Sequence, residues 1–280
     1  MSKLTSTADL ENLRQTLLTK RDPNQPCITI CAGTGCKAYG CDKVTDAFKQ
    51  EIKKKKLGRK VAIRTTGCHG FCEQGPLVVI YPKKIFYPRV KVEDVHEIIS
   101  KTIIKGDLIE RLLYVDPDTK EKIVYEDDVP FYKKQRRLIF GNNGVIDPTS
   151  IDDYFAAGGY AALAKVLNGI SPEEVIETIK KANLRGRGGG GFPAGVKWES
   201  CREVEGDVRY VICNADEGDP GAYMDRSLLE GNPHSVLEGM IIGAYAIGSN
   251  QGYVYVRNEY PLAVSNLTVA LKQAERYGLL

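Results

Sequence analysis

A run of glycines between residues 183 and 198 limits what this chain can fold into more than any other stretch. The sequence there, NLRGRGGGGFPAGVKW, contains six glycines, two arginines, one lysine and the only tryptophan of the chain. Glycine adds no packing surface and loses much backbone entropy on folding, so such a run predicts unusual dihedrals or close approach to a ligand. Arg185, Arg187 and Lys197, together with free backbone N–H groups, suit a phosphate. A flexible linker is the alternative, although linkers rarely carry FP and KW pairs among their glycines.

Two familiar phosphate-binding motifs do not explain this run. Gly186, Gly188 and Gly191 match the spacing GxGxxG, but that motif needs a strand before it and a helix after it. The segment before the run instead predicts a helix, because Ser171 is a good N-cap and Pro172 favours the first helical position. A P-loop is excluded because the sequence contains no GKS or GKT.

Length and composition indicate an ordinary globular protein. The 280 residues suffice for two domains, and 42% hydrophobic and 27% charged residues are typical of soluble folds. A net charge of +3 is too small to indicate nucleic-acid binding. The four lysines at 53–56 read as a solvated helix face, with docking of an acidic redox partner as the alternative. The N-terminus has no secretion signal and no apolar run approaches the ~18–20 residues of a membrane span. We therefore expect a cytoplasmic protein without direct membrane insertion.

The first half of the chain predicts a small α/β domain of thioredoxin-like kind. A polar helix at 8–18 precedes it, and a connector with a hairpin at 111–115 and 121–125 follows it. Apolar residues at helical or strand spacing give the order strand, helix, strand, strand, strand, helix. The expected elements are strands at 27–30, 61–65, 77–81 and 85–90, and helices at 42–56 and 93–104.

The second half predicts a mostly parallel sheet, because strands and helices alternate there. The expected elements are helices at 151–167, from Ser171, at 234–247 and at 261–277, and strands at 209–213 and 252–257. We divide the chain into an N-terminal helical extension at 1–24, the first α/β domain at 25–105, a connector at 106–150 and a second α/β domain at 151–280.

Four cysteines form two pairs on glycine-containing loops, each after a strand. They are Cys31 with Cys36, and Cys68 with Cys72. Four thiolates at these separations can enclose an iron–sulfur cluster, whose potential neighbouring backbone N–H groups would tune. Zinc also takes four cysteines, and unrelated buried thiols are a third interpretation. His69 lies between ligand candidates and is expected to be exposed or to support the site from outside.

The remaining cysteines, Cys27, Cys41, Cys201 and Cys213, have no matching partners. A reducing cytoplasm gives eight cysteines little reason to form disulfides.

An acidic turn follows the predicted strand at 209–213. Open α/β sheets bind ligands beyond the carboxyl ends of their strands. Asn214, Asp216 and Glu217 could therefore bond a ligand there, and a solvated acidic turn is the alternative.

Two groups of motifs resemble known families. The spacing CX4C with CHGFCEQGP at 68–76 is similar to thioredoxin-like [2Fe-2S] ferredoxins. The sequence LRGRGGGGFPAGVKW at 184–198, with CNADEGDPGAYMDR at 213–226, resembles the FMN- and NADH-binding subunit of respiratory complex I. Joined in one chain, they look like the flavoprotein β subunit of multimeric, often electron-bifurcating, iron hydrogenases and formate dehydrogenases.

The resemblance implies a thioredoxin-like [2Fe-2S] domain followed by the N-terminal part of an α/β FMN-binding domain. It implies a subunit that passes electrons between NAD(H) or NADP(H), FMN and iron–sulfur clusters. Partners would be other iron–sulfur and catalytic subunits, including a small [2Fe-2S] ferredoxin-like subunit. No catalytic side chain is expected, because hydride transfer is the cofactors' own chemistry. The implied contacts are Gly186, Gly188, Lys197, Asn214, Asp216 and Glu217 for FMN, Phe192 and Asp219 for the nucleotide, and Cys31, Cys36, Cys68 and Cys72 for the cluster.

The chain departs from the family pattern at three places. Gly190 replaces a usual alanine, and Ser200 replaces an aromatic residue that stacks on the nucleotide. The chain also stops at Leu280, before the family's GEE loop and its CX2CX2C site for a [4Fe-4S] cluster, so we expect an incomplete domain that does not oxidise NADH alone. The alternatives are a one-electron [2Fe-2S] carrier or scaffold with an inert flavin half, and a zinc-stabilised interaction module.

Overall fold

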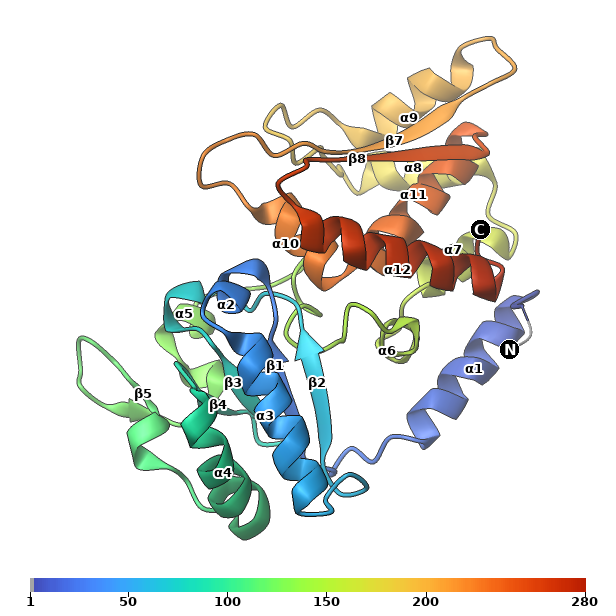
Figure 1. Ribbon diagram of the computed structural model, residues 1–280. Helices are drawn as coiled ribbons and strands as arrows, with labels where there is room; N and C mark the ends of the chain where they lie inside the picture. The colour runs from blue at the N-terminus through green and yellow to red at the C-terminus, as the bar shows by residue number, and fades with distance from the viewer. Residues whose placement is uncertain (1–2) are drawn as a thin grey trace.

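The computed structural model describes residues 3–280 and shows two α/β halves joined by a largely irregular connector (Figure 1). The first half contains a four-stranded sheet and the second a two-stranded one. This confirms the α/β class expected from the sequence. None of the helices within residues 3–280 combines the length and the apolar character needed to cross a membrane.

The first half is built on a sheet with the strand order β2-β1-β3-β4. β1 and β2 are parallel, so the chain must cross over between them, and helix α3 makes that crossing. β3 and β4 form the expected antiparallel pair around a short turn. The bounds are β1 Cys27–Cys31, α2 Thr34–Ala38, α3 Cys41–Lys54, β2 Ala62–Thr66, β3 Val78–Tyr81 and β4 Ile85–Tyr87.

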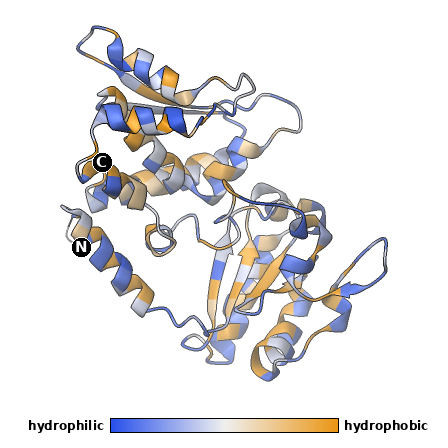
Figure 2. Ribbon diagram, turned by 180° about the vertical axis from the view of Figure 1, so that it is seen from behind, coloured by the Kyte–Doolittle hydropathy of each residue, from blue (hydrophilic) through white to orange (hydrophobic). Residues whose placement is uncertain are grey.

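Apolar side chains of the sheet and of one face of α3 form the first core. Val44, Phe48 and Ile52 recur at helical spacing on α3 and are buried. Ile28 and Ile30 of β1 are fully covered. The strands of this sheet stand out as hydrophobic segments in Figure 2.

A closing helix and part of the connector complete the first core. The helix expected at 93–104 is present, although most of it is of the π type. The expected connector hairpin is also present, with shorter strands than predicted. Phe131 of the connector stacks on Phe71 with ring centroids 4.4 Å apart. The bounds are α4 Val95–Glu97, the π-helix Ile98–Lys105, β5 Tyr114–Val115, β6 Lys122–Ile123 and α5 Pro130–Lys133.

The N-terminal helix α1 (Thr7–Thr19) packs against the second half of the chain. Leu10 joins a core cluster with Phe155, Tyr160 and Tyr277. The start of the described chain lies beside its C-terminal helix, where the Leu4 N–H donates to the Tyr277 carbonyl at 2.8 Å (Figure 1).

The prediction of a single helix at 151–167 is wrong, because the chain forms two helices there. α6 (Ile151–Ala156) and α7 (Ala161–Leu167) are separated by Gly158 and Tyr160, which both have positive φ. The buried carboxylate of Glu238 accepts hydrogen bonds from the Tyr154 hydroxyl (2.6 Å), from the Tyr160 N–H (2.7 Å) and from the Leu163 N–H (3.0 Å). It thus stabilises the break between the helices.

The second half consists of two parallel strands and the helices around them. The expected helices after Ser171, at 234–247 and at 261–277 are confirmed, as are both strands and their parallel direction. Helices α9 and α10 were not expected. The bounds are α8 Pro172–Lys181, α9 Ala194–Glu203, β7 Tyr210–Ala215, α10 Met224–Gly231, α11 Pro233–Ile247, β8 Gln251–Val256 and α12 Pro261–Tyr277.

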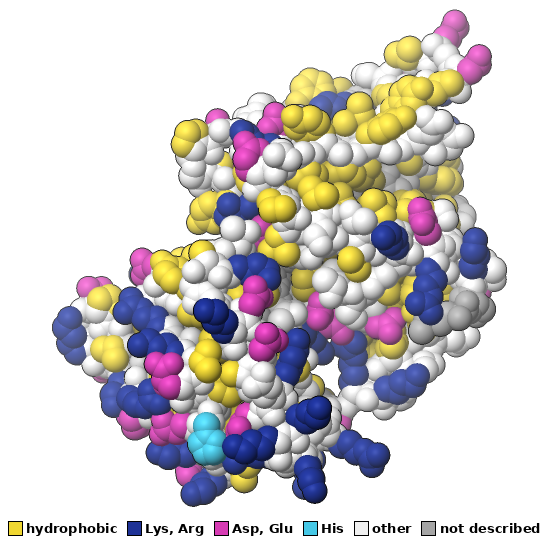
Figure 3. Space-filling model, viewed as in Figure 1, with side chains coloured by type: hydrophobic (Ala, Val, Ile, Leu, Met, Phe, Trp, Pro, Cys, Tyr) yellow, Lys and Arg dark blue, Asp and Glu magenta, His cyan; other side chains and the backbone are white. Residues whose placement is uncertain are grey.

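One face of this two-stranded sheet is exposed. Ala215 on β7, with Val254 and Val256 on β8, packs into the core formed with α12. Ile212 and Tyr253 on the other face remain 66% and 57% exposed. Hydrophobic side chains accordingly gather over the upper half of the molecule in Figure 3.

Candidate cofactor sites

The two cysteine loops leave the same edge of the first sheet. Cys31 ends β1 and is paired in register with Thr66, the last residue of β2. Because the strands are parallel, the loops that follow them start side by side. Cys36 lies in the short helix α2, and Cys68 and Cys72 lie in the loop after β2.

Glycines let the two loops interleave closely. A Cβ atom added at Gly33 would lie 2.9 Å from the Cys68 Cβ, and one added at Gly35 would lie 3.1 Å from the Cys72 Sγ. A Cβ atom at Gly75 would lie 2.8 Å from the Cys36 Sγ. Side chains at these three positions would therefore collide with the thiols or their stems. Gly33, Gly35 and Gly75 thus lie against the cysteine side chains, whereas Gly67 faces Gly231 instead.

Each of the four thiols contacts at least one other. The Sγ atoms of Cys68 and Cys72 are 3.5 Å apart, and the Gly70 N–H donates to the Cys68 Sγ at 3.3 Å. Hydrogen bonds from Cys31 and Cys72 lower the pKa of the Cys68 thiol to about 2. Contacts with Cys36 and Cys68, together with burial, raise the pKa of Cys31 well above its ordinary value. These four cysteines thus form one linked group.

This group differs from a mononuclear metal site. Among residues 3–280, no three Cys, His, Asp or Glu side chains surround a point in the geometry that one metal ion requires. The thiols instead form a line of contacts from Cys36 through Cys31 and Cys68 to Cys72. The four thiols therefore lie next to one another without surrounding a point where a single ion would bind.

Cys41 and Cys27 lie apart from this group. Burial raises the pKa of Cys41 to about 12 and also raises that of Cys27. Both thiols are therefore held in the protonated form at neutral pH.

His69 is buried. This excludes the first of the two predictions made for it, that its side chain is exposed. Its Nδ1 lies 3.0 Å from the Glu126 carboxylate and its Nε2 lies 2.9 Å from the Thr66 hydroxyl. Both ring nitrogens are therefore engaged by side chains other than cysteine. His69 supports the loop between Cys68 and Cys72 and joins it to the connector.

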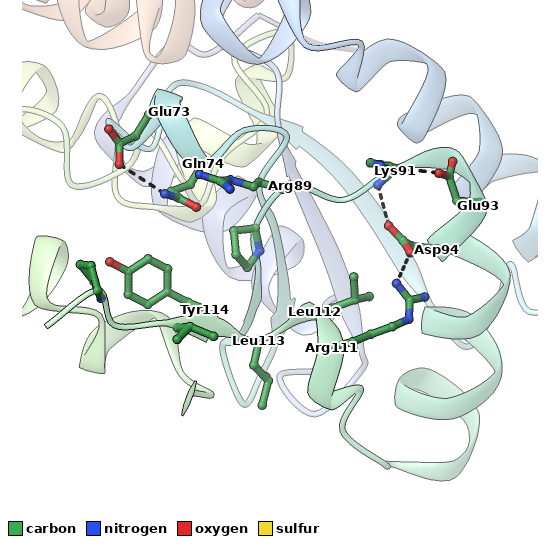
Figure 4. Close-up of a pocket in the computed structure, with 13 residues that line it drawn as sticks. Glu73, Gln74, Arg89, Lys91, Glu93, Asp94, Arg111, Leu112, Leu113 and Tyr114 are labelled. Atoms are coloured by element: carbon green, nitrogen blue, oxygen red, sulfur yellow. Dashed lines mark hydrogen bonds and ion pairs between the residues drawn. The ribbon is translucent and has the colours of Figure 1, made fainter. Parts of the chain in front are cut away.

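A cavity of about 590 Å³ lies beside the residues that follow Cys72 (Figure 4). Four of its charged groups pair with one another, Lys91 with Glu93 and Asp94 with Arg111. The Asp94 carboxylate accepts from the Lys91 N–H at 2.8 Å and from the Arg111 guanidinium at 2.6 Å. These pairs stabilise the closing helix and the connector of the first half.

The glycine run forms an exposed loop between α8 and α9. Its ends are closed by hydrogen bonds from Gly186 N to Phe192 O (2.9 Å) and from Ala194 N to Leu184 O (2.8 Å). Between them, Gly189 and Gly191 have φ values of 103° and 59°, which side chains other than glycine rarely adopt.

Packing does not explain Gly188, nor Gly190, whose Cβ position is equally open. A Cβ atom at Gly188 would meet no protein atom within 4 Å, so nothing in the fold requires glycine there. This open space fits a ligand that approaches the backbone. Lys197, in the first turns of α9, places its Nζ 5.9 Å from the centroid of the half-exposed Phe192 ring.

Helix α9 begins directly after the loop, at Ala194. The GxGxxG motif therefore does have a helix after it, but helix α8 precedes it where a strand is needed, so the motif remains excluded. The N-terminus of α9 adds free N–H groups and a positive dipole end to the basic loop. Pro193, which favours the start of a helix, was the only local sequence signal for it, because Gly195 and Val196 are weak helix formers.

The acidic turn lies at the carboxyl end of β7. Asn214, Asp216 and Asp219 are exposed, and Asp216 lies 3.6 Å from the Arg257 guanidinium. Glu217 instead accepts hydrogen bonds from backbone N–H groups at the start of α10. Because α9 leads away from the glycine loop and β7 returns, the two loops lie at the same end of the second half (Figure 1).

Two family models match the chain. Residues 16–103 match the thioredoxin-like [2Fe-2S] ferredoxin family, and residues 179–278 match the Nuo51 FMN-binding domain. The chain carries both domains. The ferredoxin domain contains all four clustered cysteines, and the FMN-binding domain contains the glycine loop, the acidic turn and helix α10. FMN and a [2Fe-2S] cluster are thus the cofactors of these two families. The clustered thiols fit the iron–sulfur cluster, and the open glycine loop fits FMN.

Similar curated proteins are longer than the stretch that they share with this chain. The chain is 55% identical over 148 residues to the NADP-reducing hydrogenase subunit HndC of Solidesulfovibrio fructosivorans, covering 53% of this chain and 30% of that one. It is 50% identical over 131 residues to a subunit of the NADH-quinone oxidoreductase of Aquifex aeolicus, covering 47% and 30%. The chain therefore matches less than a third of the length of either relative. The thioredoxin-like [2Fe-2S] ferredoxin of Aquifex aeolicus aligns at 33% identity with a TM-score of 0.30, over 31% of this chain and 93% of that one.

Proposed function

We propose that this chain is the flavin-binding part of an NAD(P)H oxidoreductase that exchanges electrons with iron–sulfur clusters of a multisubunit hydrogenase or formate dehydrogenase. One observation carries the proposal. Four cysteine thiols lie together beyond the ends of β1 and β2, and this edge of the sheet faces helix α10, which begins after the acidic turn. When bound, FMN exchanges a hydride with a nicotinamide nucleotide and single electrons with an iron–sulfur centre.

The side chains have separate roles in this proposal. Cys31, Cys36, Cys68 and Cys72 ligate the [2Fe-2S] cluster. Gly186, Gly188 and Lys197 hold the FMN phosphate, while Asn214, Asp216 and Glu217 orient the ribityl chain or ring. Phe192 and Asp219 contact the nicotinamide nucleotide.

The partners are other iron–sulfur and catalytic subunits, among them a small [2Fe-2S] ferredoxin-like subunit. We place the complex in the cytoplasm. All eight cysteines are free thiols in the described residues.

The cofactor content of the purified chain tests this proposal. Protein prepared without oxygen should contain iron, sulfide and FMN, and its reduced form should give an S = 1/2 EPR signal. Cys68→Ser should remove or alter that signal. Cys41→Ser is the matched control, because Cys41 is a buried thiol of the same domain outside the cluster group.

Two other outcomes would point to other functions. A cluster without bound flavin would indicate a one-electron carrier with an inert flavin half. Colourless protein with stoichiometric zinc would contradict the redox function altogether.

A further inference from the structure

Helix α10 connects the two proposed cofactor sites. Glu217 of the acidic turn accepts hydrogen bonds at the start of the helix, from Asp225 N and Arg226 N. At the other end, Glu230 and Gly231 contact the cysteine loops of the ferredoxin domain. Eight helical residues span about 12 Å, so both contacts lie on one short rigid element.

Glu230 makes the polar contact with the cysteine loops. Its carboxylate accepts from the Thr34 N–H at 3.0 Å and from the Thr34 hydroxyl at 2.5 Å. Thr34 lies between Cys31 and Cys36 in the sequence. Glu230 is only 2% exposed, and its nearest cation is the Arg226 guanidinium at 3.8 Å.

The surrounding residues hold Glu230 in this orientation. The Asn266 side chain donates to the Glu230 carbonyl at 2.7 Å, which fixes the end of α10 on α12. A Cβ atom on Gly67 would lie 2.3 Å from the Gly231 Cα, so the second cysteine loop touches the same end of the helix. Glu230 also lines a cleft of about 410 Å³ between the two halves.

A buried carboxylate is a costly way to hold a loop. A neutral side chain could accept from Thr34 without the desolvation penalty of a buried charge. The negative charge of Glu230 lies against Thr34, in the loop that carries the two proposed cluster ligands Cys31 and Cys36. Charge and hydrogen bonds around an iron–sulfur cluster set its reduction potential.

We propose that Glu230 is a positioning residue that clamps the Cys31–Cys36 loop to α10 and thereby holds the [2Fe-2S] cluster at a fixed distance from the flavin loop. This inference rests on the proposed function for the identity of the two cofactors. The clamp itself rests on the Thr34 contacts alone. Its negative charge also disfavours the reduced cluster, which carries one more electron.

Hydrogen exchange and redox titration of the full 280-residue chain test this proposal. In Glu230→Ala, the amides of residues 32–38 should exchange at least tenfold faster, because Thr34 N–H loses its acceptor. In Glu230→Gln, which keeps the shape but not the charge, the EPR-monitored midpoint potential should become more positive. Thr34→Ser keeps the hydroxyl and should match the wild type in both measurements. Glu275→Gln, an exposed position on α12, controls for a general effect of charge.

The outcomes separate the clamp from the proposed function. Unchanged exchange and unchanged potential in both Glu230 variants would overturn the clamp. If the wild-type protein never assembles a cluster and Glu230→Ala still exchanges faster than the wild type, the clamp is supported and the proposed function is overturned. If Glu230→Ala does not fold, Thr34→Val provides the exchange measurement, because it removes one of the two hydrogen bonds.

Discussion

The Glu217 carboxylate accepts a hydrogen bond from the Asp225 N–H at 3.0 Å, across a loop of seven intervening residues. A second bond, from the Arg226 N–H at 3.2 Å, makes Glu217 the cap of α10. Burial and the nearby Glu217 charge raise the pKa of the Asp225 carboxyl. The acidic turn is therefore tied to the helix that reaches the cysteine loops, and is not simply a solvated turn.

Replacing Glu217 should destabilise the protein even without flavin. Glu217→Ala removes both hydrogen bonds and should cost about 1 kcal/mol, the usual cost of a lost helix cap. Urea unfolding of the flavin-free chain measures this. Asp219→Ala, on the same loop but exposed, should leave the unfolding free energy unchanged. Equal stability of both variants would show that the cap is not important.

The glycine loop should tolerate a side chain at Gly188 until flavin is added. Because a Cβ atom there meets no protein atom, Gly188→Val should keep the melting temperature but abolish FMN binding. Lys197→Ala should weaken binding of FMN far more than binding of riboflavin, which lacks the phosphate. Flavin fluorescence titration measures both affinities. Equal losses for the two ligands would mean that Lys197 does not contact the phosphate.

The stability of the second half should fall as the pH drops below about 6.5. His234 is buried between the Tyr160 hydroxyl (2.9 Å) and Gln273 (3.1 Å), and burial lowers its pKa below the ordinary value of 6.5. The unfolded chain therefore binds a proton that the folded chain excludes. Its contribution to stability is complete above pH 6.5 and decreases as the pH falls through that value. His234→Gln should reduce this pH dependence, measured by urea unfolding between pH 5 and 8. An unchanged slope would exclude His234 as its source.

Two helical glycines should respond in opposite ways to alanine. A Cβ atom at Gly231 would lie 2.5 Å from the Asn143 side chain, so Gly231→Ala should destabilise the contact between the halves. Gly239 on α11 has open space at its Cβ position, so Gly239→Ala should stabilise the protein by roughly 0.5–1 kcal/mol. Thermal unfolding of the two variants gives the comparison. A stabilised Gly231→Ala variant would show that the halves are not in close contact at this point.

Local sequence patterns predicted most of the fold. The start of α8 was predictable because Ser171 and Pro172 are adjacent in the sequence, and the structure adds two hydrogen bonds between Ser171 and Glu174. The break between α6 and α7 was missed, although Gly158 and Gly159 marked it, because the carboxylate that stabilises it comes from Glu238 far along the chain.

The same distinction applies to the candidate sites. The cysteine pairs and the glycine loop were visible because their residues are close in the sequence. The clamp between Thr34 and Glu230 joins residues 196 positions apart, so no local pattern could indicate it. The lysine run at 53–56 lies at the end of α3 opposite the cysteine loops (Figure 1), a position that fits a solvated face and a docking surface equally.

The contact of the cysteine loops with α10 also bears on how the holoprotein is assembled. Cys31 and Cys36 are buried, and a cavity of about 360 Å³ beside Cys68 is walled by Tyr223 and Met224 of the FMN-binding domain. For the [2Fe-2S] cluster that we propose at these thiols, iron and sulfide would reach them most easily before that domain covers them. During synthesis the ferredoxin domain leaves the ribosome first and folds as a unit. The order of the two domains along the chain thus provides an interval in which iron and sulfide can be delivered to the thiols.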